Sequence, residues 1–277
     1  MYPKLFTIPQ FQFFKYKIGP IVIYSWGTFV ALGFLIGILL AMRWAKRENI
    51  DPDHVLNVSV WSIISGILGA RIVYVIKYWN AYKGNPISIL QLWDGGLIFF
   101  GGFFAATIVV LIYLWRHKIP YWKFLDVIAP SIAIGSAIGR IGCFLNGCCY
   151  GYETPLLWGV KFPNVYGYRH ATELYYTLAF LIVFIYLLRV RNRKTFDGEV
   201  ATNFFVYYSL AFFIVEIFRD NPRNFLYLTG SQTVSLLLIA FGIYAYRRRK
   251  AGLPLLPQSC PLYRKVSTEP KVKKNKR

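Results

Sequence analysis

An arginine at the end of an apolar run is the first candidate for chemistry in this sequence. Arg140 follows a hydrophobic stretch of small residues, from Ile128 to Ile138, which is long enough to lie largely inside a membrane. A charged side chain is costly there unless it meets an anion or a carboxylate, which makes Arg140 a functional-site candidate. Gly142 and the other glycines around it let backbone N–H groups approach a bound group. The stretch therefore predicts an anion-binding site.

Four further polar residues fall within or at the ends of apolar runs, and they are Arg71, Glu173, Glu216 and Arg219. Glu216 and Arg219 are three residues apart, so they share a helix face and are expected to pair. For Arg71 and Glu216 an interhelical ion pair that fixes packing is an open alternative to a ligand site. Arg140 and Arg219 outnumber the carboxylates expected near them, which favours an anionic ligand. The planar guanidinium suits phosphate oxygens, and a phospholipid headgroup is the anion found at that depth.

Composition places these residues in a membrane protein. The chain is 56% hydrophobic, and its apolar runs of roughly 18–22 residues can each cross a bilayer. We predict an all-α polytopic membrane protein with about seven transmembrane helices. The expected spans are residues 20–42, 57–76, 97–115, 125–144, 172–190, 200–218 and 231–246. The net charge of +20 does not indicate a nucleic-acid partner, because much of it lies in the C-terminal tail and in short loops.

The distribution of Lys and Arg predicts the orientation. Most of them follow the first, third, fifth and seventh spans, and the side richer in basic residues is expected to be cytoplasmic. The N-terminus is then outside, the C-terminus is inside, and Arg140 lies near the outer face. We divide the chain into an integral membrane bundle, 1–246, and a basic, disordered cytoplasmic tail, 247–277. The tail either rests on anionic lipid or serves only as a topology anchor. No cleavable signal peptide is visible in residues 1–17.

The cysteines are interpreted as structural thiols by default. Cys143 has the usual character of a small buried apolar residue. Cys148 and Cys149 are adjacent and are expected on the outer side. A vicinal disulfide is strained, and a lone cysteine pair is weak evidence for a metal site. Cys260 is an implausible partner because it falls on the cytoplasmic side.

Two glycine pairs flank the start of the third span. They are Gly95 with Gly96 and Gly101 with Gly102. Glycine lets backbone approach either a ligand or a neighbouring helix. Packing accounts for one pair, whereas two pairs on the same side as the arginines favour a binding site.

Together these residues resemble the prolipoprotein diacylglyceryl transferases of bacterial inner membranes, from about Tyr24 to Leu238. Gly139-Arg140-Ile141-Gly142 with Phe144 and Asn146 resembles the family signature G-R-x-G-N-F-x-N-x-E. Four further segments match in order, and they are Trp93-Asp94-Gly95-Gly96 with Gly101-Gly102, His170-Ala171-Thr172-Glu173-Leu174-Tyr175, Val215-Glu216-Ile217-Phe218-Arg219, and Leu228-Thr229-Gly230-Ser231-Gln232 through Ser235.

The resemblance implies transfer of the diacylglyceryl group of phosphatidylglycerol to the lipobox cysteine of a prolipoprotein signal peptide. The product is a thioether, glycerol 1-phosphate leaves, and no metal or organic cofactor is needed. Arg140 and Arg219 would neutralise the phosphate charge that builds in the transition state. Asn146 and Tyr24 would hold glycerol or ester oxygens. The remaining expected substrate-binding residues are Arg71, Gly95, Gly96, Gly101, Gly102, Gly142 and Glu216. The protein would be a multi-pass inner-membrane enzyme among membrane lipids, with its active site toward the outer leaflet.

Three departures from the family pattern concern proton transfer. Phe100 occupies the position of a family histidine thought to activate the thiol, Cys143 replaces the signature Asn, and Cys148 replaces its Glu. His170 is then a candidate base, and the alternative is a histidine that only positions a loop. The acceptor thiol could also lose its proton to water or be acidified by the two arginines. A divergent paralogue that binds or remodels anionic phospholipid without alkylating a cysteine remains the alternative function. A seven-span transporter or receptor is less favoured, because no midplane row of acids or broken-helix pair is present.

Overall fold

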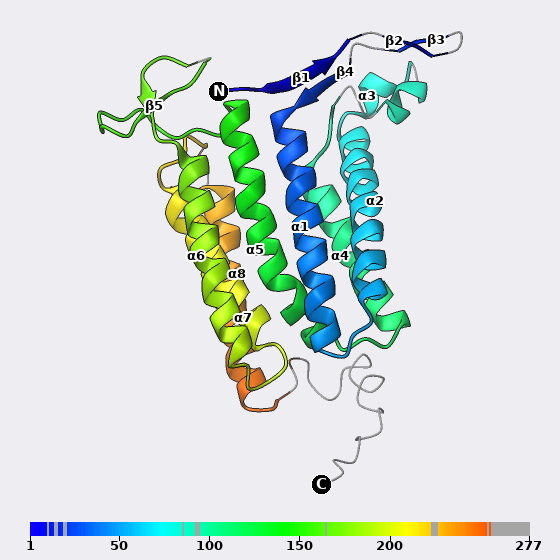
Figure 1. The fold of residues 1–277 in the computed structure, drawn as a ribbon, viewed down its shortest axis with the longest axis vertical. Coiled ribbons are helices and arrows are strands. Elements are labelled where there is room, and N and C mark those ends of the chain that lie inside the picture. The colour runs from blue at the N-terminus through cyan, green and yellow to red at the C-terminus, as the bar shows by residue number, and fades with distance from the viewer. Residues whose placement is uncertain are drawn as a thin grey trace.

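Long antiparallel helices form the body of the protein in this computed structural model (Figure 1). The structure describes residues 1–9, 11–13, 16–18, 21–84, 86–91, 95–163, 165–222, 227–253 and 255. Among these residues seven helices have 18 or more residues, and each overlaps one predicted span. They are α1 (Ser25–Arg47), α2 (Pro52–Lys77), α4 (Phe99–Arg116), α5 (Tyr121–Asn146), α6 (Thr172–Asn192), α7 (Glu199–Glu216) and α8 (Gly230–Lys250).

Five of these helices, α1, α2, α4, α5 and α6, are long and apolar enough to cross a membrane. The prediction of a helical membrane protein is therefore confirmed, while the total of seven spans and the orientation of the termini stay predictions. Helix α8 continues to Lys250, beyond the expected end of the bundle at residue 246. The predicted disordered tail lies mostly outside the described residues.

Local sequence signals explain where several helices begin and end. Asp51 caps α2 by accepting a hydrogen bond from the N–H of Asp53 at 3.0 Å, and Pro52 occupies the first turn. Thr229 and Gln232 form a capping box at the start of α8. Helix α5 ends at Gly147, whose φ of 72° is the left-handed conformation that terminates helices.

Glycines set the closest helix contacts. Helix α1 packs along α5, where a Cβ on Gly33 would clash with the carbonyl oxygen of Gly135. Helix α2 packs along α4, where Gly69 faces Gly101 in the same way. Small residues on both helices let the backbones approach, which is the packing that membrane helices favour. Helix α5 also contacts α6 and α7, and α7 contacts α8, so α5 connects the two sides of the bundle.

Short strands that the sequence did not predict lie at the end of the bundle where α1 begins (Figure 1). Strand β1 (Lys4–Ile8) pairs antiparallel with β4 (Ile21–Tyr24), and β2 (Phe11–Phe13) pairs with β3 (Tyr16–Ile18). Strands β5 (Val160–Lys161) and β6 (Tyr168–Arg169) form a third two-stranded sheet among the described residues. The α2–α4 connection contains the short helices α3 (Trp79–Tyr82) and η1 (Pro86–Leu90).

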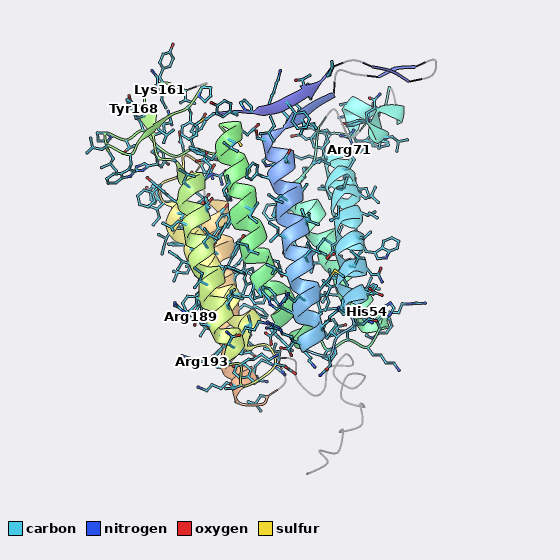
Figure 2. All side chains as sticks on the ribbon, viewed as in Figure 1. His54, Arg71, Lys161, Tyr168, Arg189 and Arg193 are labelled. Atoms are coloured by element: carbon cyan, nitrogen blue, oxygen red, sulfur yellow. The ribbon has the colours of Figure 1, made fainter. Side chains whose placement is uncertain are left out.

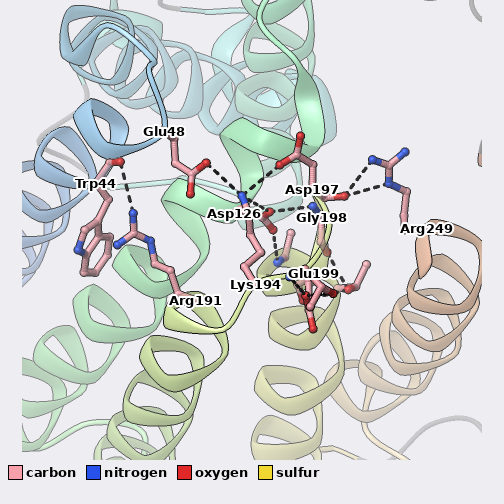
Figure 3. A network of polar contacts seen from close by, with 12 residues as sticks. Trp44, Glu48, Asp126, Arg191, Lys194, Asp197, Gly198, Glu199 and Arg249 are labelled. Atoms are coloured by element: carbon pink, nitrogen blue, oxygen red, sulfur yellow. Dashed lines mark hydrogen bonds and ion pairs between the residues drawn. The ribbon is translucent and has the colours of Figure 1, made fainter. Parts of the chain in front are cut away.

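A polar network fixes the opposite end of the bundle (Figure 3). The ammonium of Lys194 lies 3.1 Å from the Glu48 carboxylate and 3.3 Å from that of Asp126. Asp126 is only 2% exposed and accepts hydrogen bonds from the N–H groups of Gly198 at 2.7 Å and Ala201 at 2.8 Å. The network joins the end of α1, the start of α5 and the α6–α7 connection.

Basic residues that the sequence assigned to opposite sides lie at opposite ends of the molecule. Figure 2 shows Arg189 and Arg193 at the end that carries the Lys194 network, and Lys161 at the other end with Arg71. The site residues discussed next belong to the end that carries Lys161 and Arg71.

Candidate functional site

The candidate site lies where α5 ends, α6 begins, α7 ends and α8 begins. Arg140 is in the last turns of α5 and Glu173 is in the first turn of α6. Glu216 is the last residue of α7, and Arg219 follows it by three residues. Segments far apart in sequence thus bring two arginines and two acids to one end of the bundle.

Arg140 lies over an aromatic floor. Its guanidinium carbon is 4.2 Å from the centre of the Tyr176 ring and 5.7 Å from that of Phe212. Ring faces attract a guanidinium without consuming its hydrogen-bond donors. Within the described part of the chain, no hydrogen bond or ion pair is made by the Arg140 side chain. Its planar fork is therefore available to an external anion.

Glu216 organises the surroundings of both arginines. It is 1% exposed, and its carboxylate accepts hydrogen bonds from Tyr176 Oη at 2.7 Å, Asn221 Nδ2 at 2.7 Å and Thr229 Oγ1 at 3.2 Å. The Arg219 guanidinium lies 3.6 Å from the same carboxylate, which confirms the predicted pair. Glu216 thus fixes the ring under Arg140 as well as the orientation of Arg219.

The loop after α5 is attached to the Arg219 segment through Gly151. Gly151 forms a β-bridge with Arg219, and its N–H donates to the carbonyl of His170 at 2.9 Å. A Cβ at Gly151 would collide with the carbonyl oxygen of Phe218 and with the side chains of Thr172 and His170. The close approach needs glycine, and it brings three of the family-like segments into contact.

Three cysteine thiols meet beside the arginines. The Sγ atoms of Cys143, Cys148 and Cys149 all lie within 4.8 Å of one another, and those of Cys148 and Cys149 are 3.7 Å apart. No disulfide joins these three thiols. Hydrogen bonds with the Cys143 and Cys148 thiols, and then the charges of Arg219 and Arg140, hold the pKa of the Cys149 thiol well below its usual range.

His170 is engaged with its own surroundings. Its Nδ1 is 3.1 Å from the Tyr175 hydroxyl, and its ring packs at 5.3 Å from the ring of Phe218. The Tyr175 hydroxyl also accepts a hydrogen bond from Trp158 Nε1 at 3.0 Å. These contacts, with the bond from Gly151, match the interpretation in which His170 positions the loop.

Glu173 is a buried acid that the sequence analysis left without a role. Its side chain is fully buried, and within the described residues neither carboxylate oxygen has a hydrogen-bond partner. It interacts electrostatically with Cys149, Arg140 and Arg219. A buried carboxyl without a partner is costly, which indicates that a ligand or a proton completes it.

Tyr24 and Asn146, both assigned to substrate binding by the resemblance, line one groove. The groove has a volume of ≈ 530 Å³. Its walls come from strand β4, the start of α1 and the end of α5, and they are Ile23, Tyr24, Trp26, Gly27, Thr28 and Asn146. Gly142 packs against Trp26 and Phe29 of α1, so it brings α1 close to α5 beside this groove.

Arg71 has a different environment from Arg140. Its guanidinium donates to five carbonyl oxygens at 2.5–3.3 Å, those of Ser88, Ile89, Gln91, Gly95 and Gly96. All five N–H donors are therefore committed to backbone, and Arg71 is paired with neither a carboxylate nor a free anion. We interpret it as the residue that holds the α2–α4 connection. Trp93 and Asp94 of that connection lie outside the described residues.

The glycine pairs also divide by role. Gly95 and Gly96 have φ values of 79° and 75°, so they make the turn whose carbonyls meet Arg71. Gly101 and Gly102 are buried against α2, where they permit helix packing. Phe100, at the position of the family histidine, is 56% exposed at the start of α4 and contacts the ring of Phe99.

Sequence reasoning missed Tyr176 and Gly151. Tyr176 lies in an aromatic, apolar run and carries no signal that separates it from a packing residue. Gly151 follows the signature by three residues. Its role depends on contacts with Phe218 and Arg219, which lie almost seventy residues later in the sequence.

These features define a class: a helical membrane protein that gathers two arginines and two buried acids at one end of its bundle. The chain matches the family model described as "Prolipoprotein diacylglyceryl transferase" over residues 14–248. It belongs to the prolipoprotein diacylglyceryl transferase family.

Three relatives named phosphatidylglycerol–prolipoprotein diacylglyceryl transferase are similar to the chain over most of its length. The Finegoldia magna protein is 35% identical over 229 residues, which cover 82% of this chain and 92% of that protein. The Listeria innocua protein is 34% identical over 250 residues, 86% of this chain and 90% of that protein. The Synechococcus elongatus protein is 34% identical over 244 residues, 82% of this chain and 83% of that protein.

Proposed function

We propose that this chain transfers the diacylglyceryl group of phosphatidylglycerol to the cysteine thiol of a prolipoprotein lipobox, the first step of lipoprotein maturation. It is a transferase of the bacterial inner membrane with its site toward the outer leaflet. Family membership supports the reaction. The observation that carries the site assignment is Arg140, a partly buried guanidinium whose donors have no partner among the described residues.

The reaction displaces phosphate from carbon by sulfur. The thiolate attacks the glycerol carbon, the C–O bond to phosphate breaks, and glycerol 1-phosphate leaves with the electron pair. Negative charge builds on the phosphate oxygens in the transition state. Arg140 and Arg219, both preorganised by the Glu216–Tyr176 contacts, are placed to bind and neutralise that charge.

The neighbouring groove accounts for the rest of the lipid headgroup. Tyr24 and Asn146 line it and present a hydroxyl and an amide to glycerol or ester oxygens. Apolar helix surface continues from the groove along α1, which suits the acyl chains. The remaining expected substrate-binding residues support the site indirectly, through the backbone and side chains that they position. They are Gly95, Gly96, Gly101, Gly102, Gly142, Arg71 and Glu216.

A second function, binding or remodelling of anionic phospholipid without alkylation, is favoured by one observation. Phe100 replaces the family histidine and cannot accept a proton. Complementation of a strain depleted of its own transferase separates the two functions. A reporter lipoprotein that gains the mass of a diacylglyceryl group supports transfer. Stable expression of the chain in the membrane with no added mass on the reporter supports lipid binding alone.

A further inference from the structure

The cysteine cluster, Cys143, Cys148 and Cys149, is not used by the chemistry described above. Cys143 and Cys148 lie within the signature, where they replace the family's Asn and Glu, and Cys149 follows it directly. All three Sγ atoms lie within 4.8 Å of one another. Zinc–thiolate bonds of about 2.3 Å in a tetrahedral site place sulfur atoms about 3.8 Å apart. Rotamer shifts of about 1 Å or less would thus bring all three sulfurs onto one ion.

The backbone presents the three thiols to a common point. Cys143 is in the last turn of α5, and Gly147 turns the chain back so that the N–H of Cys148 donates to the carbonyl of Cys143 at 3.3 Å. Cys149 has a φ of 73°, an uncommon left-handed conformation for a residue other than glycine. Its carbonyl is held by Thr172 Oγ1 at 2.7 Å. A residue held in that conformation by its surroundings indicates a built site.

Electrostatics favour a metal thiolate at this place. A divalent ion on three thiolates leaves one net negative charge, and the guanidinium groups of Arg140 and Arg219 lie at the same end of the bundle. Glu173 supplies an independent indication, because it is fully buried, has no hydrogen-bond partner among the described residues and directly follows Thr172, whose hydroxyl holds the Cys149 carbonyl. A carboxyl in that position is completed by a proton or by a ligand that carries one.

We propose that Cys143, Cys148 and Cys149 bind one Zn²⁺ ion whose fourth position takes the acceptor cysteine of the lipoprotein substrate. Within the described residues no His or carboxylate joins the three cysteines as a fourth ligand. Three protein ligands with one open position are the arrangement of catalytic zinc sites. This inference rests on the proposed transferase function and goes beyond the resemblance, which implies no metal.

The ion supplies what the missing histidine would have supplied. A thiol that coordinates zinc is deprotonated, so the acceptor enters as a thiolate and its proton passes to the Glu173 carboxylate. The sulfur then forms the bond to the glycerol carbon while the C–O bond to phosphate breaks. The phosphate leaves with that electron pair, and the thioether, a weaker ligand, leaves the ion. Zinc stays divalent throughout, and no oxidant is needed.

Metal binding is measurable without turnover. The full chain, reduced and anaerobic in detergent, is titrated with Co²⁺ as a spectroscopic substitute for Zn²⁺. We expect about one Co²⁺ per chain, with thiolate-to-cobalt absorption and tetrahedral d–d bands that Zn²⁺ abolishes. Cys143→Ser, Cys148→Ser and Cys149→Ser each remove a direct ligand and should each weaken binding by more than the roughly 10- to 100-fold that loss of an outer-shell partner costs. Cys260→Ser, which changes a cysteine outside the described residues, is the matched control and should leave the bands unchanged.

The acceptor step is tested on the same samples. A lipobox peptide with its cysteine should shift the cobalt bands, whereas the same peptide with serine should not. Glu173→Gln should retain the metal and lower the transfer rate at least about tenfold, with Glu153→Gln as its exposed control.

Several results overturn the inference. One is the absence of Co²⁺ bands in the wild type, and another is the survival of those bands in the cysteine variants. Binding of trigonal Cu⁺ in preference to Zn²⁺ is a third, and a disulfide among the three thiols of unreduced, active protein is a fourth. Each of these outcomes is evidence against the metal site, and so against the inference. Bands unaffected by the cysteine peptide, or full transfer after removal of the metal, also overturn it. If the metal binds as expected but the reporter lipoprotein never gains mass, the proposed transferase function fails and the metal site stands.

Discussion

Replacing Glu216 with glutamine tests whether one buried carboxylate positions both arginines. Glu216→Gln keeps the shape of the side chain but removes its charge. The least disruptive amide orientation leaves an oxygen facing Tyr176 and Arg219, because Asn221 and Thr229 can each reverse their hydrogen bonds toward an NH₂ group. Hydrogen bonds to a charged group are worth about 1.5–3 kcal/mol and neutral ones about 0.5–1.5 kcal/mol.

Weakening the charge-assisted hydrogen bond from Tyr176 and losing the 3.6 Å ion pair with Arg219 together cost about 2–3 kcal/mol. If that free energy is what holds the two arginines in place for the transition state, kcat/KM falls by about 30- to 150-fold. The assay follows transfer from phosphatidylglycerol to a lipobox peptide by mass, in detergent, alongside thermal unfolding of the same protein. Glu153→Gln, an exposed carboxylate at the same end of the bundle, is the control and should keep wild-type kinetics.

A companion variant separates the ring of Tyr176 from its hydroxyl. Tyr176→Phe keeps the aromatic face under Arg140 and removes the hydrogen bond to Glu216. We expect a loss of about tenfold or less, and a coupling of about 1 kcal/mol with Glu216→Gln in a double-mutant cycle. Glu216→Gln within twofold of wild-type kcat/KM, or strict additivity of the two changes, would refute this positioning role.

Three further predictions concern other parts of the fold. Asp126→Asn should lower the free energy of unfolding by about 2–3 kcal/mol, because one of its backbone N–H donors or Lys194 then faces an NH₂ group. Thermal unfolding measures this, with Asp53→Asn as the control variant. An unchanged unfolding midpoint for Asp126→Asn contradicts the prediction. Arg71→Lys should speed amide hydrogen exchange in residues 86–91, since an ammonium cannot donate to all five carbonyls. Exchange at the wild-type rate argues against a role for Arg71 in holding the α2–α4 connection. His170→Gln should leave the pH dependence of kcat/KM unchanged if His170 only positions its loop, and the loss of a titrating limb would make it the base.

The helices were predictable because each is a long apolar run, and the structure places a helix within a few residues of every predicted span. The strands before Ser25 were not, because residues 1–24 are aromatic and lack both an apolar run and a clear alternation. Their pairing joins segments that carry no strong hairpin signal in the sequence.

The two arginines with similar sequence signals turned out to have different partners. Arg71 and Arg140 are both charged residues beside glycines in apolar helices. The sequence does not reveal that a loop folds over Arg71 and offers it five carbonyls, because backbone acceptors are present at every residue. The pairing of Glu216 with Arg219 was predictable, because a separation of three residues fixes their geometry whatever the tertiary fold.

The cysteine cluster shows where spacing alone is insufficient. Cys148 and Cys149 are neighbours, and Cys143 is five residues earlier, which in a continuing helix would not bring all three thiols together. Two left-handed residues, Gly147 and Cys149, reverse the chain and create the cluster. Left-handed glycine after a helix is a recognisable signal, whereas left-handed cysteine is not.

The central claim is that Arg140 binds the phosphate of the lipid donor, and one variant tests it most directly. Arg140→Ala removes a guanidinium that has no hydrogen-bond or ion-pair partner among the described residues, so the fold should survive with a near-normal unfolding midpoint. Removal of a preorganised donor to a developing oxyanion lowers rates about 100- to 1000-fold. We therefore expect kcat/KM for transfer from phosphatidylglycerol to fall by at least about 100-fold in folded protein. A folded Arg140→Ala variant that stays within tenfold of the wild type would contradict the account.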